Sequence, residues 1–124
     1  MIIGLGLDVV ELARIEQAVA RHGDHFIDRI LTPNERSAMP AVATPYLAAR
    51  FAAKEAAAKA LGTGIAKGVG FQTIEIRRLP SGQPQLELLG AARELAESLG
   101  VNTTHISLTH GRDIASAVVV LEKN

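Results

Sequence analysis

The segment from Pro45 to Leu61 constrains this chain more than any other, because it predicts a long helix built almost entirely from Ala, Leu, Lys, Glu and Arg. Thr44 and Pro45 form a helix start signal, and Gly62 marks the end. Aromatic residues are only 3% of the 124 residues, so the core must be made of small aliphatic side chains that bury little area each. We therefore expect one domain, residues 1–124, which gains stability by associating with copies of itself.

The remaining periodicities predict strands and helices in mixed order. Thr32-Pro33-Asn34-Glu35 has the pattern of a capping box at the start of a short helix. The predicted strands are residues 2–8, 71–79, 85–89, 104–109 and 114–121, and the other predicted helices are residues 10–22, 24–30 and 91–99. This order favours an α+β domain with a small, mostly antiparallel sheet packed with helices. The last strand is apolar on both faces, so both faces should be covered.

Charge and composition exclude several classes of protein. Thirteen basic and thirteen acidic residues leave no net field to attract nucleic acid or a membrane, so an electrostatic partner must be recognised by a local patch. The absence of cysteine excludes disulfides and thiolate metal sites. Residues 1–4 lack the basic region of a signal peptide, and residues 114–121 are too short to cross a bilayer. We expect a cytoplasmic protein with no nucleic-acid or membrane partner.

Asp8 is a candidate ligand for a hard cation. It shares a strand face with Gly4 and Gly6, and glycine inside a strand often marks close approach by a ligand or another backbone. The same Asp8, with Glu11 three residues later, also fits the N-cap of the following helix, and caps of this kind are the more common role. From these residues alone, the cap is favoured over the metal ligand.

The charged residues of the predicted helix 45–61 fall in two rows. Arg50 and Lys54 form one row, and Glu55 and Lys59 form the row beside it. One carboxylate among three cations suits a site for a divalent metal together with phosphate oxygens. The alternative is a solvated helix face on which Glu55 and Lys59 form an ordinary i,i+4 pair.

Two glycine-rich stretches fail as nucleotide motifs. Residues 4–9 lack the third glycine of a dinucleotide fingerprint, and residues 62–68 lack the Gly-Lys-Ser/Thr ending of a P-loop. Exposed backbone amides after the helix would still suit a phosphate, although from these residues alone an ordinary helix end and loop is the favoured interpretation of residues 62–68.

Two further polar groups are candidates for binding. His105, Ser107 and Thr109 share one face of a predicted strand, which is either a solvent face or the wall of a ligand site. Arg14 and Arg21 lie on one helix face, near a positive stretch that reaches Phe26, and form a local basic patch suited to an acidic protein. A solvated helix surface is again the alternative.

Together these stretches resemble one family, the holo-acyl-carrier-protein synthases, which are the short, bacterial-type phosphopantetheinyl transferases. The resembling N-terminal residues are Gly4–Asp8, Arg14-Ile15, Phe26, Arg29–Thr32 and Glu35. The central block, RFAAKEAAAKALGTG at residues 50–64, is long and specific, and residues 82–84 and 105–110 resemble later motifs. Only residues 36–44 show no matching pattern.

The resemblance implies a phosphopantetheinyl-transferase fold and a Mg²⁺-dependent enzyme. Such an enzyme moves 4′-phosphopantetheine from coenzyme A to a serine of an apo acyl carrier protein, releases adenosine 3′,5′-bisphosphate and supports fatty acid biosynthesis. The implied metal ligands are Asp8 and Glu55, and catalysis is implied for these two with Lys59 and His105. The implied coenzyme contacts are Arg50, Lys59, Gly62, Gly64, Gly82, Pro84, His105 and Thr109. Arg14, Arg21 and Phe26 are implied to bind the acidic carrier, and the assembly is implied to be a homotrimer with sites between subunits.

Two other functions remain compatible with the residues themselves. A non-catalytic module for an anionic nucleotide or acidic protein would keep the basic residues, but it would not need Asp8 and Glu55 together. A small oligomeric scaffold would bind no coenzyme at all.

Overall fold

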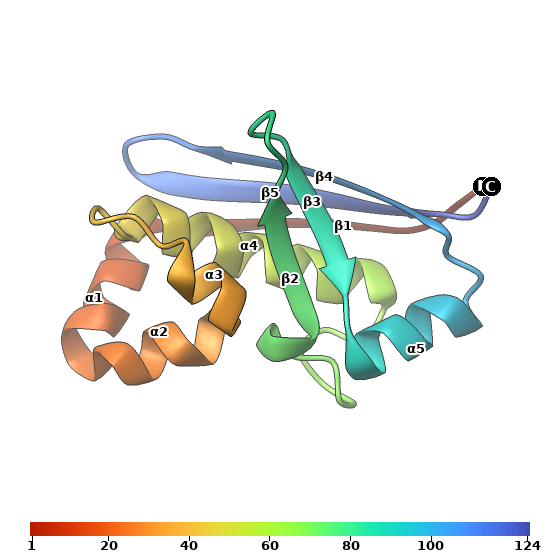
Figure 1. The fold of residues 1–124 in the computed structure, drawn as a ribbon, viewed down its shortest axis with the longest axis horizontal. Helices are drawn as coiled ribbons and strands as arrows, with labels where there is room; N and C mark the ends of the chain where they lie inside the picture. Colours follow the sequence, from red (N-terminus) through yellow and green to blue (C-terminus); the bar gives the residue numbers. More distant parts are fainter.

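The computed structural model describes all residues, 1–124, as an α+β fold in which every strand pairing is antiparallel (Figure 1). This confirms the predicted fold class. The elements in chain order are β1 (Ile2–Glu11), α1 (Leu12–His22), α2 (Asp24–Ile30), α3 (Pro33–Ser37), α4 (Thr44–Leu61), a 3₁₀ turn (Phe71–Thr73), β2 (Ile74–Arg78), β3 (Pro84–Leu88), α5 (Gly90–Ser98), β4 (Thr103–His110) and β5 (Ile114–Glu122). The strands form two sheets, β1-β5-β4 and β2-β3.

Helix α4 lies along the inner face of the three-stranded sheet, and glycine makes that contact possible. A Cβ atom on Gly4 would lie 2.0 Å from the carbonyl oxygen of Ala60, and one on Gly6 would lie 1.8 Å from that of Ala56. On β5, Ala115 and its inward neighbours are buried in the same interface. The bare strip on β1 therefore receives a helix backbone and not a ligand. The small β5 residues Ala115 and Ala117 admit α4 at close range.

The outer face of the same sheet remains uncovered within the chain. Leu5, Leu7 and Val9 are 55–65% exposed, and Ile114 on β5 is 45% exposed. Within one chain, only one face of the last strand is covered, and covering of the other face by association stays a prediction. An apolar sheet face of this kind marks a surface suited to association.

The boundary between β1 and α1 differs from the prediction. Strand β1 continues through Val10 and Glu11, which pair with Ala115 and Ile114 of β5, so α1 begins at Leu12 and not at residue 10. The residue before the helix is Glu11, and no side chain caps the helix. Asp8 thus lies inside a strand, and its interpretation as a helix cap is wrong.

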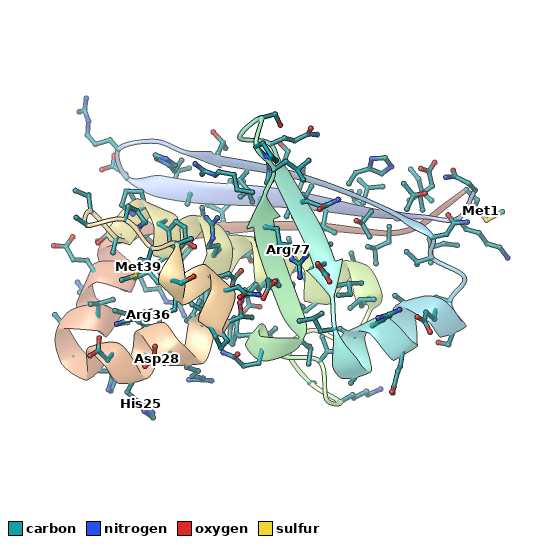
Figure 2. All side chains as sticks on the ribbon, viewed as in Figure 1. Met1, His25, Asp28, Arg36, Met39 and Arg77 are labelled. Atoms are coloured by element: carbon teal, nitrogen blue, oxygen red, sulfur yellow. The ribbon has the colours of Figure 1, made fainter.

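Other local signals are confirmed. Thr32 and Glu35 form the predicted capping box on α3, and α4 ends at Gly62 in the left-handed conformation with φ 86°. The predicted strand 71–79 is shorter, because residues 71–73 form a 3₁₀ turn before β2. Arg36 joins α3 to α2 through ion pairs with Asp24 at 3.0 Å and Asp28 at 3.6 Å. Figure 2 shows Arg36 near Asp28. None of the helices has the length and apolar character to span a bilayer.

Candidate active site

Asp8 and Lys59 meet where β1 passes along α4. The Lys59 ammonium donates a 2.8 Å hydrogen bond to Oδ1 of Asp8 and a 3.1 Å bond to the carbonyl oxygen of Leu7. Gly4 and Gly6 let the strand touch the helix, so Asp8, two residues further on the same strand face, faces the helix side chains. The Asp8 side chain is 16% exposed and that of Lys59 is 50% exposed, so the pair is open to solvent on the lysine side.

Glu55 completes this group with a second carboxylate. Burial raises the pKa of Glu55 above its usual value, and the negative charge of Asp8 raises it further, while Lys59 and Arg14 act in the opposite direction. These effects show that Glu55 shares one electrostatic environment with Asp8, Lys59 and Arg14. Two carboxylates that repel each other therefore share this environment with two cations, Lys59 and Arg14.

These residues fit a magnesium ion bound together with a phosphate ligand. No group of three or more His, Asp or Glu residues in the structure could hold a metal ion, so a metal here would have at most two carboxylate ligands from this chain. Mg²⁺ is usually held by one or two carboxylates, with water and substrate phosphates filling its other positions. A divalent cation between Asp8 and Glu55 would also remove their mutual repulsion.

Lys54 does not belong to this site, although it precedes Glu55 in the sequence. Its ammonium is fully buried and donates to Glu35 Oε1 at 2.6 Å and to the carbonyl oxygens of Ile30 and Phe71 at 2.7 and 2.8 Å. All three of its donors are thus used to join α2, α3 and the 3₁₀ turn to α4. The predicted cluster of three cations around one carboxylate is therefore wrong.

Gly62 and Gly64 follow Lys59 directly, at the end of α4. The amide of Gly62 donates to Lys59, and the amides of Thr63 and Gly64 donate to Ala58. Both glycines have positive φ, 86° and 63°. The favoured interpretation as an ordinary helix end is confirmed for these three amides, and the alternative that they are free to hold a phosphate is wrong. Contact of the two glycines with coenzyme stays a prediction.

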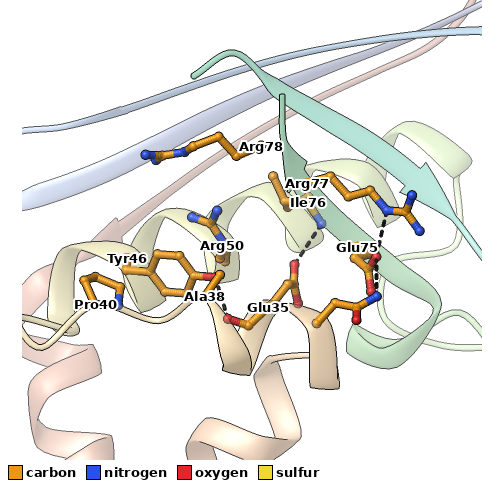
Figure 3. A pocket seen from close by; sticks show the side chains of 10 residues that line it. Glu35, Ala38, Pro40, Tyr46, Arg50, Glu75, Ile76, Arg77 and Arg78 are labelled. Atoms are coloured by element: carbon orange, nitrogen blue, oxygen red, sulfur yellow. Dashed lines mark hydrogen bonds and ion pairs between the residues drawn. The ribbon is translucent and has the colours of Figure 1, made fainter. Parts of the chain in front are cut away.

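A different set of predicted residues surrounds two adjoining cavities of about 460 and 440 Å³. Arg50, Tyr46, Arg77 and Arg78 line both cavities, and the second also has Gly82, Pro84 and His110 in its wall. Figure 3 shows the first cavity, with the Tyr46 and Arg50 side chains from α4 on one side and Arg77 from β2 on the other. The structure thus brings Arg50, Gly82 and Pro84 together, but away from the metal candidates. Residues 38–42, in the stretch without family resemblance, contribute Ala38, Pro40 and Val42 to the walls.

His105 and Thr109 lie on the outer face of the three-stranded sheet. His105 on β4 lies opposite Val120 on β5, and Val120 lies opposite the exposed Leu5 on β1. Asp8 on β1 lies opposite the buried Ala117 on β5. Residues directly opposite on neighbouring strands point to the same face, so His105 and Asp8 point to opposite faces. His105 instead contacts Glu122 at 3.0 Å. One chain alone does not bring His105 to the carboxylates.

The predicted carrier-binding residues differ in exposure: Arg14 and Arg21 are exposed, whereas Phe26 is partly buried. Arg14 and Arg21 line a shallow hollow on α1 with Gln17, Ala18 and His22, which confirms that the two arginines share one helix face. Phe26 on α2 is partly buried and packs against the core, so only part of its ring is available to a partner. Their role in binding a carrier stays a prediction.

Sequence reasoning missed Tyr46, Arg78 and the buried carboxylate Glu75, and it did not predict that Glu35 pairs with Lys54. One signal would have indicated the Lys54–Glu35 pair: helix 45–61 is apolar on every side, and a helix of that kind is buried, so its charged residues must be paired. No local signal distinguishes Tyr46 or Arg78, because β2 and α4 are brought together only by the fold.

The family model of the 4′-phosphopantetheinyl transferase superfamily matches residues 4–119. A holo-[acyl-carrier-protein] synthase from Maridesulfovibrio salexigens is 60% identical over 124 residues, covering 99% of this chain and 100% of that protein. The crystal structure of the Neisseria meningitidis holo-[acyl-carrier-protein] synthase superposes with a TM-score of 0.92 at 40% identity, covering 99% of this chain and all of that one. The Helicobacter pylori synthase in complex with coenzyme A superposes with a TM-score of 0.85 at 34% identity, covering 95% and 99% of the two chains. The chain therefore belongs to the 4′-phosphopantetheinyl transferase superfamily and, within it, to the holo-[acyl-carrier-protein] synthases.

Proposed function

We propose that this chain transfers 4′-phosphopantetheine from coenzyme A to a serine of an apo acyl carrier protein, with Mg²⁺ held by Asp8 and Glu55. The group of Asp8, Glu55 and Lys59 carries this proposal, because it combines two metal-type carboxylates with a cation that has half its surface open to solvent. A binding module for nucleotides or acidic proteins has no use for the two repelling carboxylates. Coenzyme A is an intracellular compound, so a cytoplasmic location accompanies the proposal.

The chemistry is a displacement at phosphorus. The carrier serine oxygen forms a bond to the phosphorus that bears pantetheine, the bond from that phosphorus to the adenosine-side phosphate breaks, and adenosine 3′,5′-bisphosphate leaves as the serine proton is released. When bound, Mg²⁺ supplies positive charge beside the coenzyme pyrophosphate. Lys59 binds the same phosphates and stabilises negative charge that develops on the leaving group. Asp8 orients the Lys59 ammonium, which the hydrogen bond between them keeps protonated.

We further propose a homotrimer with the reaction site between subunits. Two observations support it: the outer sheet face exposes Leu5, Leu7 and Val9, and His105 lies on that face while Asp8 lies on the other. A neighbouring copy seated on the outer face would cover the apolar surface and offer its own residues to a site opposite His105.

A mixing experiment tests the shared site directly. Asp8→Ala and His105→Ala variants, each inactive alone, are co-expressed with different tags and purified together. If the two residues act across an interface, random assembly restores about a quarter of wild-type activity, since about one interface in four then has both intact partners. A site contained in one chain would give no recovery. Sedimentation equilibrium of Val118→Lys and Val120→Lys, expected to be monomeric and inactive, provides an independent check.

Carrier binding is assigned to the basic face of α1. Reversing Arg14 and Arg21 to Glu is expected to raise the KM for the carrier about 10-fold or more and to weaken its salt dependence, with coenzyme affinity unchanged. Equal loss of affinity for both substrates would place these arginines elsewhere.

The activity itself is tested by intact mass spectrometry. The protein is incubated with coenzyme A, Mg²⁺ and an apo carrier, and the carrier should gain the mass of one phosphopantetheine. The matched controls are EDTA in place of Mg²⁺ and a carrier whose acceptor serine is replaced by alanine. Coenzyme binding without any mass gain would favour the non-catalytic module, and absence of binding would favour a scaffold.

A further inference from the structure

The C-terminal end of α2 is satisfied by side chains that come from outside the helix. The last carbonyl groups of a helix have no partner within it, and for α2, with seven residues, these are the carbonyls of residues 28–31. The side-chain amide of Gln72 donates to three of them, the carbonyl oxygens of Asp28, Arg29 and Leu31, at 2.9, 3.2 and 2.9 Å. Lys54 donates to the fourth, that of Ile30, at 2.7 Å. Gln72 therefore determines where this end of α2 lies.

The 3₁₀ turn that carries Gln72 is itself attached to α4. It lies at the start of β2, beside the end of α2 (Figure 1). The Phe71 ring stacks on Phe51 of α4 with the ring centres 5.6 Å apart, and the guanidinium carbon of Arg29 stands 6.0 Å from the centre of the Phe71 ring. Phe51, Glu55 and Lys59 follow one another at a spacing of four residues, so they share one face of α4. The turn thus connects α2 to the helix face that carries the candidate active site.

The other contacts of α2 restrain its orientation less. A helix of seven residues is not stable alone in water, so α2 depends on what it packs against. Its two buried isoleucines attach it to the core, but apolar contact has no preferred direction. The ion pairs of Arg36 with Asp24 and Asp28 lie at the surface, where such pairs contribute little. The hydrogen bonds at its C-terminal end are therefore the directional contacts that fix α2 against the 3₁₀ turn.

We propose that Gln72 is a positioning residue for the acidic carrier protein: it holds the C-terminal end of α2 so that Phe26 keeps the orientation in which the carrier docks. This inference rests on the proposed function, in which the carrier binds to α1 and Phe26 and the reacting phosphate lies at Glu55 and Lys59. A carrier seated on α2 must bring its serine to that phosphate. The polar contacts of Gln72 and the stacked rings of the 3₁₀ turn hold α2 in register with α4, without any contact between Gln72 and either substrate.

Steady-state kinetics with each substrate varied in turn tests this role. Gln72→Met has nearly the same size but no donor, so it should raise the KM for the carrier about 3- to 10-fold, with kcat and the KM for coenzyme A within about 2-fold of wild type. Gln72→Lys supplies an ammonium whose donors can reach the same carbonyls, and it should bring the carrier KM back to within about 2-fold. Gln85→Met, at an exposed position of β3, is the matched control and should behave as wild type.

Two comparisons separate positioning from a merely structural role. Partial loss of fold removes active molecules, so it lowers the apparent kcat and leaves both KM values unchanged. In a Phe26→Ala background, Gln72→Met should raise the carrier KM no further, because the residue through which Gln72 acts is gone. In the same background Gln72→Lys and Gln72→Met should give equal carrier KM values, whereas attraction between the new lysine and the acidic carrier would keep the lysine variant lower.

The possible results are distinct. An unchanged carrier KM in Gln72→Met, or an equal rise in the KM of both substrates, overturns the role of Gln72. A rise in the Phe26→Ala background as large as in wild type overturns action through Phe26. Circular dichroism melting curves identify a variant that has lost its fold, and Gln72→Asn, which keeps the amide on a shorter chain, then carries the test with the same expected rise. A wild type that modifies no carrier removes the proposed function and this inference together, whereas an active wild type with a normal Gln72→Met overturns this inference alone.

Discussion

Helix α4 carries two lysine–carboxylate pairs five residues apart, Lys54 with Glu35 and Lys59 with Asp8. The distances from lysine Nζ to carboxylate oxygen are similar, 2.6 and 2.8 Å. The side chains of Lys54 and Glu35 are 0% and 1% exposed, whereas those of Lys59 and Asp8 are 50% and 16% exposed. Burial lowers the pKa of Lys54, against the effect of Glu35, whereas the hydrogen bond from Asp8 raises the pKa of Lys59. The same chemical pair therefore joins secondary-structure elements in one environment and remains available to a ligand in the other.

The two pairs differ in their availability to a ligand, because the charges of the buried pair have more hydrogen-bond partners within the protein. Every donor of Lys54 is used, and Glu35 accepts two backbone amides besides, so removing either partner leaves a buried charge alone. Lys59 bonds to Asp8 and to the carbonyl oxygen of Leu7, and half of its side chain is open to solvent. A ligand phosphate can replace water at Lys59 without unfolding anything, and no such exchange is open to Lys54.

The largest expected effect follows from breaking the buried pair. Lys54→Met should lower the free energy of unfolding by about 3–5 kcal/mol, because it leaves the Glu35 carboxylate buried without its cation. Urea denaturation at neutral pH measures this change. The double variant Lys54→Met with Glu35→Gln should lose less than the single variant, since no lone charge remains. A loss for Lys54→Met of under about 1 kcal/mol would mean that the buried pair behaves like a surface pair.

Breaking the exposed pair should affect chemistry and spare the fold. Lys59→Met is expected to reduce the rate of carrier modification about 100-fold, as for loss of one group that stabilises developing charge. Its free energy of unfolding should change by less than about 1 kcal/mol. Intact mass and urea denaturation give the two values, and Lys123→Met, at the exposed C-terminal end, is the matched control. Normal turnover by Lys59→Met would show that this cation does not act on the phosphates.

The third prediction concerns Glu55 and how the stability of the protein depends on pH. The folded-state pKa of Glu55 is raised from about 4.5, so the folded state binds this proton more tightly than the unfolded state does. Stability should consequently fall as pH rises from about 4.5 through the raised pKa. Without Mg²⁺, Glu55→Gln should be more stable than wild type by up to ~1 kcal/mol at pH 7, and equal to it at pH 4.

Thermal unfolding in EDTA at both pH values checks this result. Mg²⁺ with coenzyme A should then stabilise wild type but not Glu55→Gln. A variant that is less stable than wild type at pH 7 would contradict the repulsion between the two carboxylates.

The smallest expected effect is the response to salt. The stability difference between wild type and Lys59→Met should shrink in 1 M NaCl, where the screening length is about 3 Å. The difference between wild type and Lys54→Met should stay the same, because salt does not enter the buried site. Parallel urea titrations at low and high salt measure both differences, and a salt-sensitive Lys54 effect would indicate that water reaches this pair.

Particular residues show how far sequence reasoning reached. The patterns for the capping box at Thr32 and the helix ending at Gly62 predicted the local structure correctly, because caps depend on neighbours within a few residues. Gly4 and Gly6 indicated close approach, but the sequence did not say that the approaching group is α4. Asp8 was favoured as a helix cap on the residues alone, since pairing of Val9 and Val10 with β5 is invisible to a local pattern.

The sequence by itself determined the fold class, the long alanine-rich helix and the family, because all of these depend on residue order and short-range spacing. Only the tertiary structure decided which of two lysines on one helix is buried, and that His105 and Asp8 lie on opposite sheet faces. It also decided that Tyr46, Arg50 and Arg78 meet at one cavity. The physical reason is that burial and charge pairing depend on which distant segments pack together, and a local pattern leaves that choice open.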